Sequence, residues 1–320
     1  MASTGGDAEI WRKGMAPVSG TSSAGAPLSE NRQPAEDLRP WVARLVAAKI
    51  HLPSGTKMEC GMCNDLVYVR AIFNAKWSAE TLDGHGEYER EALLFGQHSK
   101  FMPLTCEGDI MSAGFGLRAG AFHALFGRSA HDIVDRIEQN DLFGLMGPDF
   151  RETLTDQHTP EEWNLAMEEA IRRVIAKLDP EPPSKISTDF ELAAFADPSL
   201  VLADFAEDYG ISLRKLERLV KRDFGMPPKK VLRRARALDF AAQLCGVADD
   251  EEEEEMILRY FDQSHMIREF AKFFGFTPRE FRSVPRPLLT ITLEQRQARR
   301  LEELERLPEG AQRPWQADKS

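Results

Sequence analysis

Several features that define whole classes of protein are scarce in this 320-residue sequence. Its four cysteines, Cys60, Cys63, Cys106 and Cys245, are too few and too scattered for the disulfide framework of a small secreted domain. No stretch approaches the roughly 18 apolar residues of a membrane span, so no membrane partner is expected. The start, MASTGGDAEIWRKG, lacks the basic and apolar regions of a secretory signal. We therefore expect a cytoplasmic protein.

The distribution of charge sets one segment apart from the rest of the chain. The whole sequence carries a formal net charge of −11, which argues against a protein that coats nucleic acid or anionic lipid nonspecifically. Residues 212–236, in contrast, hold ten basic residues and two acidic ones. The sequence thus predicts a concentrated positive patch on a negative protein.

Composition and periodicity divide the chain into five parts and predict an α+β protein. Residues 1–37 are rich in Gly, Ser, Ala and Pro without a regular period, which predicts a disordered tail. Short apolar runs separated by turns predict a β-rich regulatory, effector-binding or dimerisation domain over 38–150. A helical connector is expected over 151–188, an all-α domain over 189–287, and a C-terminal helix and tail over 288–320.

Three segments inside these parts allow a more specific prediction. PEEWNLAMEEAIRRVIAKL, residues 160–178, has the period of an amphipathic helix, and DPEPPS after it is the expected hinge between domains. GFGLRAG resembles a dinucleotide fingerprint, but no second apolar strand follows, so a strand running into a helix is the simpler interpretation. LEQRQARRLEELERLPEG predicts a short surface helix, with a strand of a dimeric coiled coil as the alternative.

The segment LADFAEDYGISLRKLERLVKRDFG, residues 202–225, has the features of a helix-turn-helix unit. Two helices that meet at a steep angle need a small residue at their contact and a turn residue that tolerates positive φ, here Ala206 and Gly210. Ser212 is then a good N-cap, and Ile211 packs on Leu216 as a hydrophobic staple. Five basic residues remain on the outer face, where a recognition helix contacts DNA: Arg214, Lys215, Arg218, Lys221 and Arg222.

The stretch YFDQSHMIREF, residues 260–270, repeats this pattern. Asp262 is placed as the N-cap, and Phe261 and Met266 occupy the staple positions. The exposed residues of this second helix are then Gln263, Ser264, His265, Arg268 and Lys272. Side chains at successive helical positions diverge, so the Asp, Ser and His of this stretch do not form a catalytic triad, and no enzyme is predicted.

The two units lie about fifty residues apart and are joined by the helical segment PPKKVLRRARALDFAAQLCG. With YFDQSHMIREFAKFFGFTPREFR, this arrangement resembles the DNA-binding domain of the AraC family of bacterial transcription regulators, over roughly residues 195–287. GQHSKFMPL and LRAGAFHALFG are similar to the β-rich regulatory domain of one subgroup of that family. The resemblance implies a two-domain transcription regulator whose two recognition helices enter successive major grooves, about 34 Å apart.

The resemblance also implies how the residues and partners are used. Lysines and arginines would neutralise DNA phosphates, while bases would be read in one groove by Arg214, Lys215 and Arg218 and in the next by Gln263, Ser264 and Arg268. Basic residues at 229–236 would contact the DNA backbone or support the linker helix. Besides double-stranded DNA, the candidate partners are a small-molecule effector in the N-terminal domain, RNA polymerase and a second copy of the chain.

The sequence departs from the family pattern ahead of the second unit. Family members have small apolar residues where this chain has DDEEEEEMILRY, so Glu251, Glu254 and Glu255 occupy positions that are usually buried. Burying an unpaired carboxylate costs several kcal/mol, which favours a solvated acidic loop. A second interpretation is that the carboxylates repel phosphate and weaken the grip of this unit. Alanine at Glu251–Glu255 should then tighten DNA binding, most visibly at low salt.

Two other functions stay open. The chain is a protein-interaction module or anti-regulator if the second unit no longer binds DNA and the acidic run engages a basic partner. It is a thiol or metal sensor if Cys60 and Cys63, spaced as CGMC, react or bind zinc. A second cysteine pair with matching spacing is missing from the sequence, so structural thiols are the simplest interpretation, and no metal or cofactor is predicted.

Overall fold

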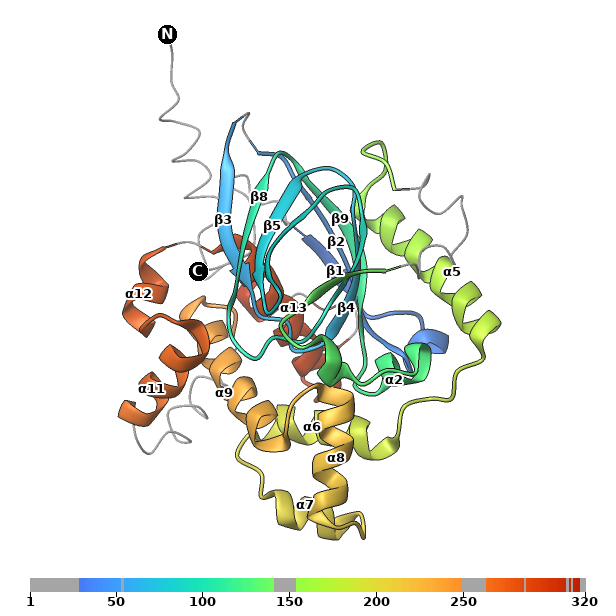
Figure 1. Ribbon diagram of the computed structural model, residues 1–320, viewed down its shortest axis with the longest axis vertical. Coiled ribbons are helices and arrows are strands. Elements are labelled where there is room, and N and C mark those ends of the chain that lie inside the picture. Colours follow the sequence, from blue (N-terminus) through green and yellow to red (C-terminus); the bar gives the residue numbers. More distant parts are fainter. Residues whose placement is uncertain are drawn as a thin grey trace.

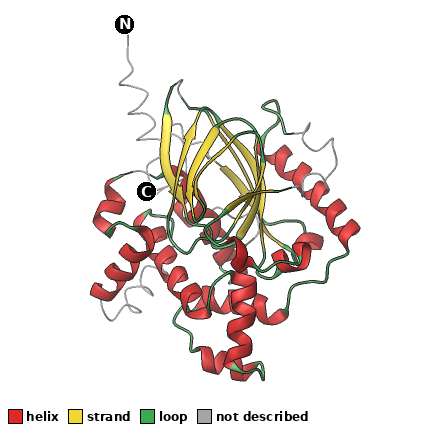
Figure 2. Ribbon diagram, in the orientation of Figure 1, coloured by secondary structure: helices red, strands yellow, loops and turns green. Residues whose placement is uncertain are grey.

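The computed structural model describes residues 29–52, 55–140, 154–248, 263–284, 286–308, 311 and 313–316. Strands gather in the N-terminal part and helices in the C-terminal part, which lies against it (Figure 1, Figure 2). This arrangement confirms the predicted α+β class. The N-cap Asp262, its neighbour Phe261 and the acidic run Asp249–Glu255 lie outside the described residues.

Two antiparallel sheets form the N-terminal domain. In spatial order, the larger sheet contains β1 (Ser29–Arg32), β2 (Val42–Ile50), β9 (Ile110–Leu117), β4 (Val67–Ile72), β7 (Ala92–Phe95) and β10 (Ile137–Gln139). The smaller sheet contains β3 (Lys57–Met62), β8 (Met102–Glu107), β5 (Lys76–Thr81) and β6 (Gly84–Tyr88). In the long β2 and β9 pair, Ile50 lies opposite Ile110 and Val42 opposite Leu117. Only the β1–β2 and β5–β6 neighbours are consecutive in the chain, so the short apolar runs of the sequence predicted strands but not their order in the sheets.

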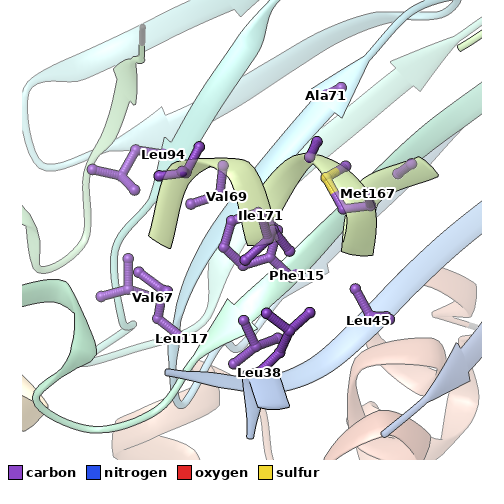
Figure 3. Close-up of a cluster of buried hydrophobic side chains, with 14 of the residues drawn as sticks. Leu38, Leu45, Val67, Val69, Ala71, Leu94, Phe115, Leu117, Met167 and Ile171 are labelled. Atoms are coloured by element: carbon purple, nitrogen blue, oxygen red, sulfur yellow. The ribbon is translucent and has the colours of Figure 1, made fainter. Parts of the chain in front are cut away.

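The larger sheet is covered on both faces, which explains why its central strands β2, β9 and β4 are mostly apolar. One face packs on the smaller sheet through a core around Phe95. The opposite face packs on helix α5 (Pro160–Leu178), whose Met167 and Ile171 lie in one buried cluster with Phe115 (Figure 3). The helix predicted over 160–178 is therefore confirmed and belongs to the core of this domain.

The predicted boundaries of this domain need two corrections. The predicted tail, residues 1–37, already contains β1 and the start of the 3-10 helix η1 (Glu36–Leu38). The strand β1 is polar and carries no alternating apolar signal; Arg32 fixes it to α5 through an ion pair with Glu168 at 2.9 Å. The predicted connector over 151–188 is also more than a link, because α5 covers the sheet.

The segment GFGLRAG runs from a strand into a helix, as its simpler interpretation predicted. Strand β9 ends at Leu117, and α2 (Ala121–Phe126) follows after Gly120, whose φ is +89°. The 3-10 helix η2 (Ala130–Ile133) comes next and lies against the C-terminal domain.

The C-terminal domain consists of short helices arranged around one long helix. In chain order they are α6 (Lys185–Ala196), α7 (Leu202–Asp208), α8 (Leu213–Phe224), α9 (Pro228–Leu244), α11 (Gln263–Phe274), α12 (Pro278–Ser283) and α13 (Pro287–Glu303), followed by the 3-10 helix η3 (Pro314–Gln316). The beginning of α9 packs in one apolar cluster with α6, α7 and α8, and its end packs in a second cluster with α11, α12 and α13. Helix α9 thus joins two subdomains. None of the described helices is long and apolar enough to span a membrane.

The prediction of a short surface helix near the C-terminus is wrong. Every residue of α13 from Pro287 to Leu301 is buried, and the helix lies between strand β3 and helix α9 (Figure 1). Its charged residues suggested a solvated face, but Arg296 and Arg299 are paired with carboxylates that other elements supply. A charge pattern in sequence does not distinguish solvated charges from paired ones.

Candidate nucleic-acid interface

The turn between α7 and α8 has the predicted helix-turn-helix geometry. Gly210 has a φ of +59°, in the left-handed region that favours glycine. The main-chain N–H of Ile211 donates to the oxygen of Ala206 at 3.0 Å, and the Ser212 hydroxyl caps α8 by accepting from the Lys215 N–H at 3.2 Å. The sequence therefore predicted the cap, the turn glycine and the start of the helix.

Helix α8 separates its apolar and basic residues on opposite faces. Leu216 and Val220 are fully buried against α6, α7 and α9. Four of the five predicted contact residues are exposed: Arg214, Lys215, Arg218 and Lys221. Arg222 differs, because it is half-buried and forms an ion pair with the buried carboxylate of Asp223 at 2.6 Å.

Helix α11 has the same two-faced construction. Phe270 and Phe274 are buried with their ring centroids 4.5 Å apart, and Phe281 of α12 lies 5.1 Å from Phe274. Arg268 and Lys272 are exposed. The remaining predicted contact residues occupy the first turn of α11, where the structure describes the backbone alone: Gln263, Ser264 and His265.

The two helices correspond to one another residue by residue at an offset of fifty positions. Each has twelve residues and is followed by a glycine of positive φ, +74° at Gly225 and +76° at Gly275. Arg218 and Arg268 are equivalent exposed arginines in the two helices. Among the described residues, each helix therefore places an exposed arginine, Arg218 or Arg268, opposite a buried apolar face.

Helix α9 uses part of the basic segment for internal contacts. Arg236 and Arg233 pair with Glu269 of α11 at 3.2 and 3.4 Å, which holds the second recognition helix to α9. Arg234 is buried and donates to the main-chain oxygen of Asp65 in the N-terminal domain at 3.0 Å. Burial lowers the pKa of Arg234 to about 10. These three arginines hold the linker helix α9 to its neighbours. This is one of the two roles predicted for the basic residues at 229–236, the other being contact with the DNA backbone.

One loop of the N-terminal domain contacts the ends of both recognition helices. In this loop, Gln97–Phe101 between β7 and β8, the Gln97 side chain donates to the main-chain oxygen of Asp223 in α8 at 3.4 Å. The main-chain N–H of Phe101 donates to the oxygen of Phe273 in α11 at 2.8 Å. Asp223 and Phe273 are equivalent positions in the two helices. The same loop therefore forms a hydrogen bond to the matching main-chain oxygen of each helix.

Helix α8 has further contacts to the N-terminal domain at its last turn. His131 of η2 lies 2.8 Å from the main-chain oxygen of Gly225 through Nδ1, and the Ser129 hydroxyl donates to the oxygen of Arg222 at 3.4 Å. A Cβ atom on Gly225 would lie 2.5 Å from Val134 Cγ2. The glycine is therefore needed both for its φ and for the close approach of the two domains.

A buried ionic cluster ties α13 to both domains. Asp65, which follows β3, pairs with Arg299 at 2.8 Å and with Arg296 at 3.4 Å, and Arg299 also pairs with Glu191 of α6 at 2.9 Å. Burial by itself would raise the pKa of Asp65, but the two guanidinium groups reverse this and hold the pKa below its usual value. Each charge in the cluster has an opposite charge beside it, which buried ions require.

The cysteine pair proposed for thiol or metal chemistry is enclosed. Cys63 is buried and Cys60 is half-buried at the contact between β3 and the helices. Burial raises the pKa of both thiols, which disfavours the reactive thiolate. Within the described ranges, no group of three or more His, Cys, Asp or Glu residues is placed to hold a metal ion.

Comparison with known families assigns the C-terminal domain. Residues 205–283 match a helix-turn-helix domain, and residues 30–139 match a domain of unknown function (DUF6597). The first match confirms the AraC-type double helix-turn-helix domain predicted from the sequence. The match covers residues 205–283 and assigns this domain alone. No curated protein matches the chain significantly.

Three solved structures that resemble the chain have low sequence identity to it. Apo ToxT from Vibrio cholerae is 9% identical, with 75% of this chain and 97% of ToxT covered and a TM-score of 0.44. ToxT from the same organism with bound unsaturated fatty acid is 8% identical, with 79% and 98% covered and a TM-score of 0.42. The AraC-like transcriptional activator CuxR is 16% identical, with 73% and 91% covered and a TM-score of 0.30. The assignment rests on the helix-turn-helix match.

Sequence reasoning missed the contacts that position the two recognition helices. Asp65 and the loop Gln97–Phe101 belong to the β-rich domain, far along the chain from the helices they contact. The only local signal was the positive-φ glycine that ends each helix. Which domain surface a helix end contacts depends on tertiary packing, and no short motif encodes it.

Proposed function

We propose that the protein binds specific DNA sequences through α8 and α11, which enter successive major grooves. The observation that carries the proposal is the pair of equivalent helices, each with a buried apolar face and an exposed arginine at the same position, Arg218 or Arg268. Both helices are held on one scaffold, α9, so their spacing is fixed by packed structure. Such pairs suit half-sites about one helical turn apart.

The proposal divides the predicted contacts by their chemistry. The first two turns of α8 carry three exposed basic residues, Arg214, Lys215 and Arg218, and recognition helices contact base edges through these turns. Lys221 lies further along the helix and would neutralise a phosphate. Arg222 is already paired with Asp223, so we assign it a supporting role unless DNA displaces that carboxylate.

In the second unit, the proposal keeps Gln263, Ser264, His265, Arg268 and Lys272 as the contact set. Arginine at 268 is the residue best suited to guanine, because its two parallel donors match the acceptors of that base in the major groove. Sequence-specific regulation also implies RNA polymerase, a second copy of the chain and a small effector as partners, and these stay predictions.

Selection of bound sites from random DNA tests the proposal directly. Two half-sites about one helical turn apart are expected if both units bind, and one half-site if the second unit is silent. Weak association that is lost entirely with salt would instead favour the interaction module.

Alanine variants at the equivalent arginines identify base contacts. Arg218→Ala should weaken binding to the selected site by about 1 to 3 kcal/mol and relax specificity at one base pair. Arg268→Ala should do the same in the other half-site. Lys177→Ala on α5 removes the same charge from an exposed position far from both helices and serves as the control. An equal loss on every DNA sequence would show that the arginines contact phosphate alone.

A further inference from the structure

A basic cleft lies where the N-terminal domain meets α9 and α11. Its volume is about 530 Å³, within the range of about 300 to 1,000 Å³ that small-molecule sites occupy. Ser99 and Lys100 of the loop Gln97–Phe101 form one wall, and α9 and α11 form the others. Both domains therefore contribute to one cavity.

The lining of the cleft is unusually rich in positive charge. Six basic side chains line it against a single carboxylate, Glu269, which already pairs with Arg233. The basic residues are Lys100, Lys230, Arg233, Arg234, Arg268 and Lys272. Like charges gathered at one cavity repel each other, so an anion bound there would relieve repulsion as well as form ion pairs.

Three of the cations lack an ion pair with any residue that the structure describes. Among the described residues, Lys100, Lys230 and Lys272 form no ion pair, although each is exposed at the cleft. They come from three different elements, the loop, α9 and α11. Arg234, in contrast, is already bonded to the N-terminal domain, so the floor of the cleft is fixed while the three ammonium groups are available to a ligand.

We propose that this cleft is the binding site of a small polyanion, a compound with two or more phosphate groups. A ligand with one negative charge would leave most of the repulsion between the cations in place. Phosphate oxygens accept from both ammonium and guanidinium donors. Buried Met226 and Phe273 supply an apolar surface at the same cleft for the uncharged part of such a ligand.

The position of the cleft favours a small ligand over the DNA backbone. It lies along the middle and end of α11, at Arg268, Lys272 and Phe273, beside the hydrogen bond from Phe101 to the end of that helix. Arg268 and Lys272 thus belong both to the lining of the cleft and to the proposed DNA contacts. Recognition helices contact DNA mainly through their first turns. A ligand here would contact the loop that touches both helix ends and would bias how they are held, a consequence that rests on the proposed DNA-binding function.

Calorimetric titration of the full-length protein with inorganic triphosphate at 150 mM salt tests the binding site without reference to DNA. One saturable site is expected, with Kd raised at least tenfold by Lys230→Gln and by Lys100→Gln. Lys229→Gln is the matched control, because Lys229 is the neighbouring exposed lysine of α9 and does not line the cleft. It should change Kd less than twofold.

Several results would overturn the proposal. One is the absence of saturable triphosphate binding. Another is binding at multiple weak sites that Lys229→Gln affects as much as Lys230→Gln, which would indicate nonspecific electrostatic attraction to the basic surface. A third is a tenfold loss of DNA affinity in Lys100→Gln without triphosphate binding, which assigns the cleft to the DNA backbone. Failure of the proposed function looks different: triphosphate binds at one site, while selection from random DNA yields no sequence.

Discussion

The two recognition helices have the same length and the same terminal glycine, yet they are docked on the N-terminal domain by different chemistry. At the end of α8 the contact is polar and tight: the Gln97 side chain donates to the main-chain oxygen of Asp223 at 3.4 Å, His131 Nδ1 lies 2.8 Å from the main-chain oxygen of Gly225, and Gly225 leaves no space for a side chain. At the end of α11 the equivalent residues are Phe273 and Gly275. Phe101 packs there on aromatic rings, and a Cβ on Gly275 would meet nothing within 4 Å.

This difference shows that equivalent local structure does not imply equivalent constraint. In both helices the main-chain oxygen at the matching position accepts a bond from the loop Gln97–Phe101. The polar contact of α8 depends on shape and on satisfied hydrogen bonds, whereas the aromatic contact of α11 tolerates small shifts. We therefore expect α8 to be the more rigidly held of the two.

The largest effect is expected from removing an aromatic ring at the α11 contact. Phe274→Ala should lower the free energy of unfolding by about 3 to 5 kcal/mol, since the ring is buried among four others. Phe224→Ala at the equivalent position of α8 should cost a similar amount. Hydrogen exchange distinguishes the two variants. The Phe101 amide should exchange faster in Phe274→Ala than in Phe224→Ala, because it bonds to α11. Equal exchange rates in the two variants would contradict the idea that the two helix ends are docked independently.

Acid should loosen the loop that both helices share. Burial lowers the pKa of His98 to about 4, although Asp135 nearby partly opposes this shift. Because the folded-state pKa lies below the ordinary value, neutral His98 stabilises the fold above about pH 6.5, and this stability is lost as the pH falls toward 4. The loss should approach about 3 kcal/mol at pH 4 in denaturant unfolding. His98→Gln should flatten the profile in this window; an unchanged slope would assign the acid sensitivity to other groups.

The two terminal glycines give the sharpest test of the comparison. Gly225→Ala and Gly275→Ala impose the same backbone strain, about 1 to 2 kcal/mol at positive φ. At Gly225 the added methyl also overlaps Val134, so its cost should exceed that of Gly275→Ala by about 2 kcal/mol. Equal losses of stability in the two variants would show that the α8 contact is as adaptable as that of α11.

The smallest effect concerns the outer faces. Lys221 is exposed in α8, and the equivalent residue of α11 is Ala271. Lys221→Ala should leave stability within about 0.5 kcal/mol and reduce the salt dependence of DNA binding by about one phosphate contact. Ala271→Lys should increase the salt dependence of DNA binding by the same amount. If neither variant changes the slope, these positions do not face the DNA backbone.

The fold was predictable from sequence wherever the signal was local. Gly210, Ser212 and the apolar spacing of α8 predicted a turn, a cap and a buried face, and the structure confirms all three. The polar strand β1 escaped prediction because it is held by its pairing with β2 and by polar side-chain contacts with residues far along the chain, such as the Arg32 ion pair with Glu168. The candidate site was predicted as a set of basic residues, but sequence did not separate exposed Arg218 from buried Arg234.

By itself, the sequence determined two basic amphipathic helices fifty residues apart and the class of domain that contains them, because period, caps and glycines act over a few residues. Tertiary structure alone decided which cations stay exposed, where α13 lies and how each helix end is held. Those outcomes depend on partners far along the chain: Arg299 of the charged segment finds Asp65 and Glu191 and becomes buried. Whether a charge is solvated or paired is set by what folds against it.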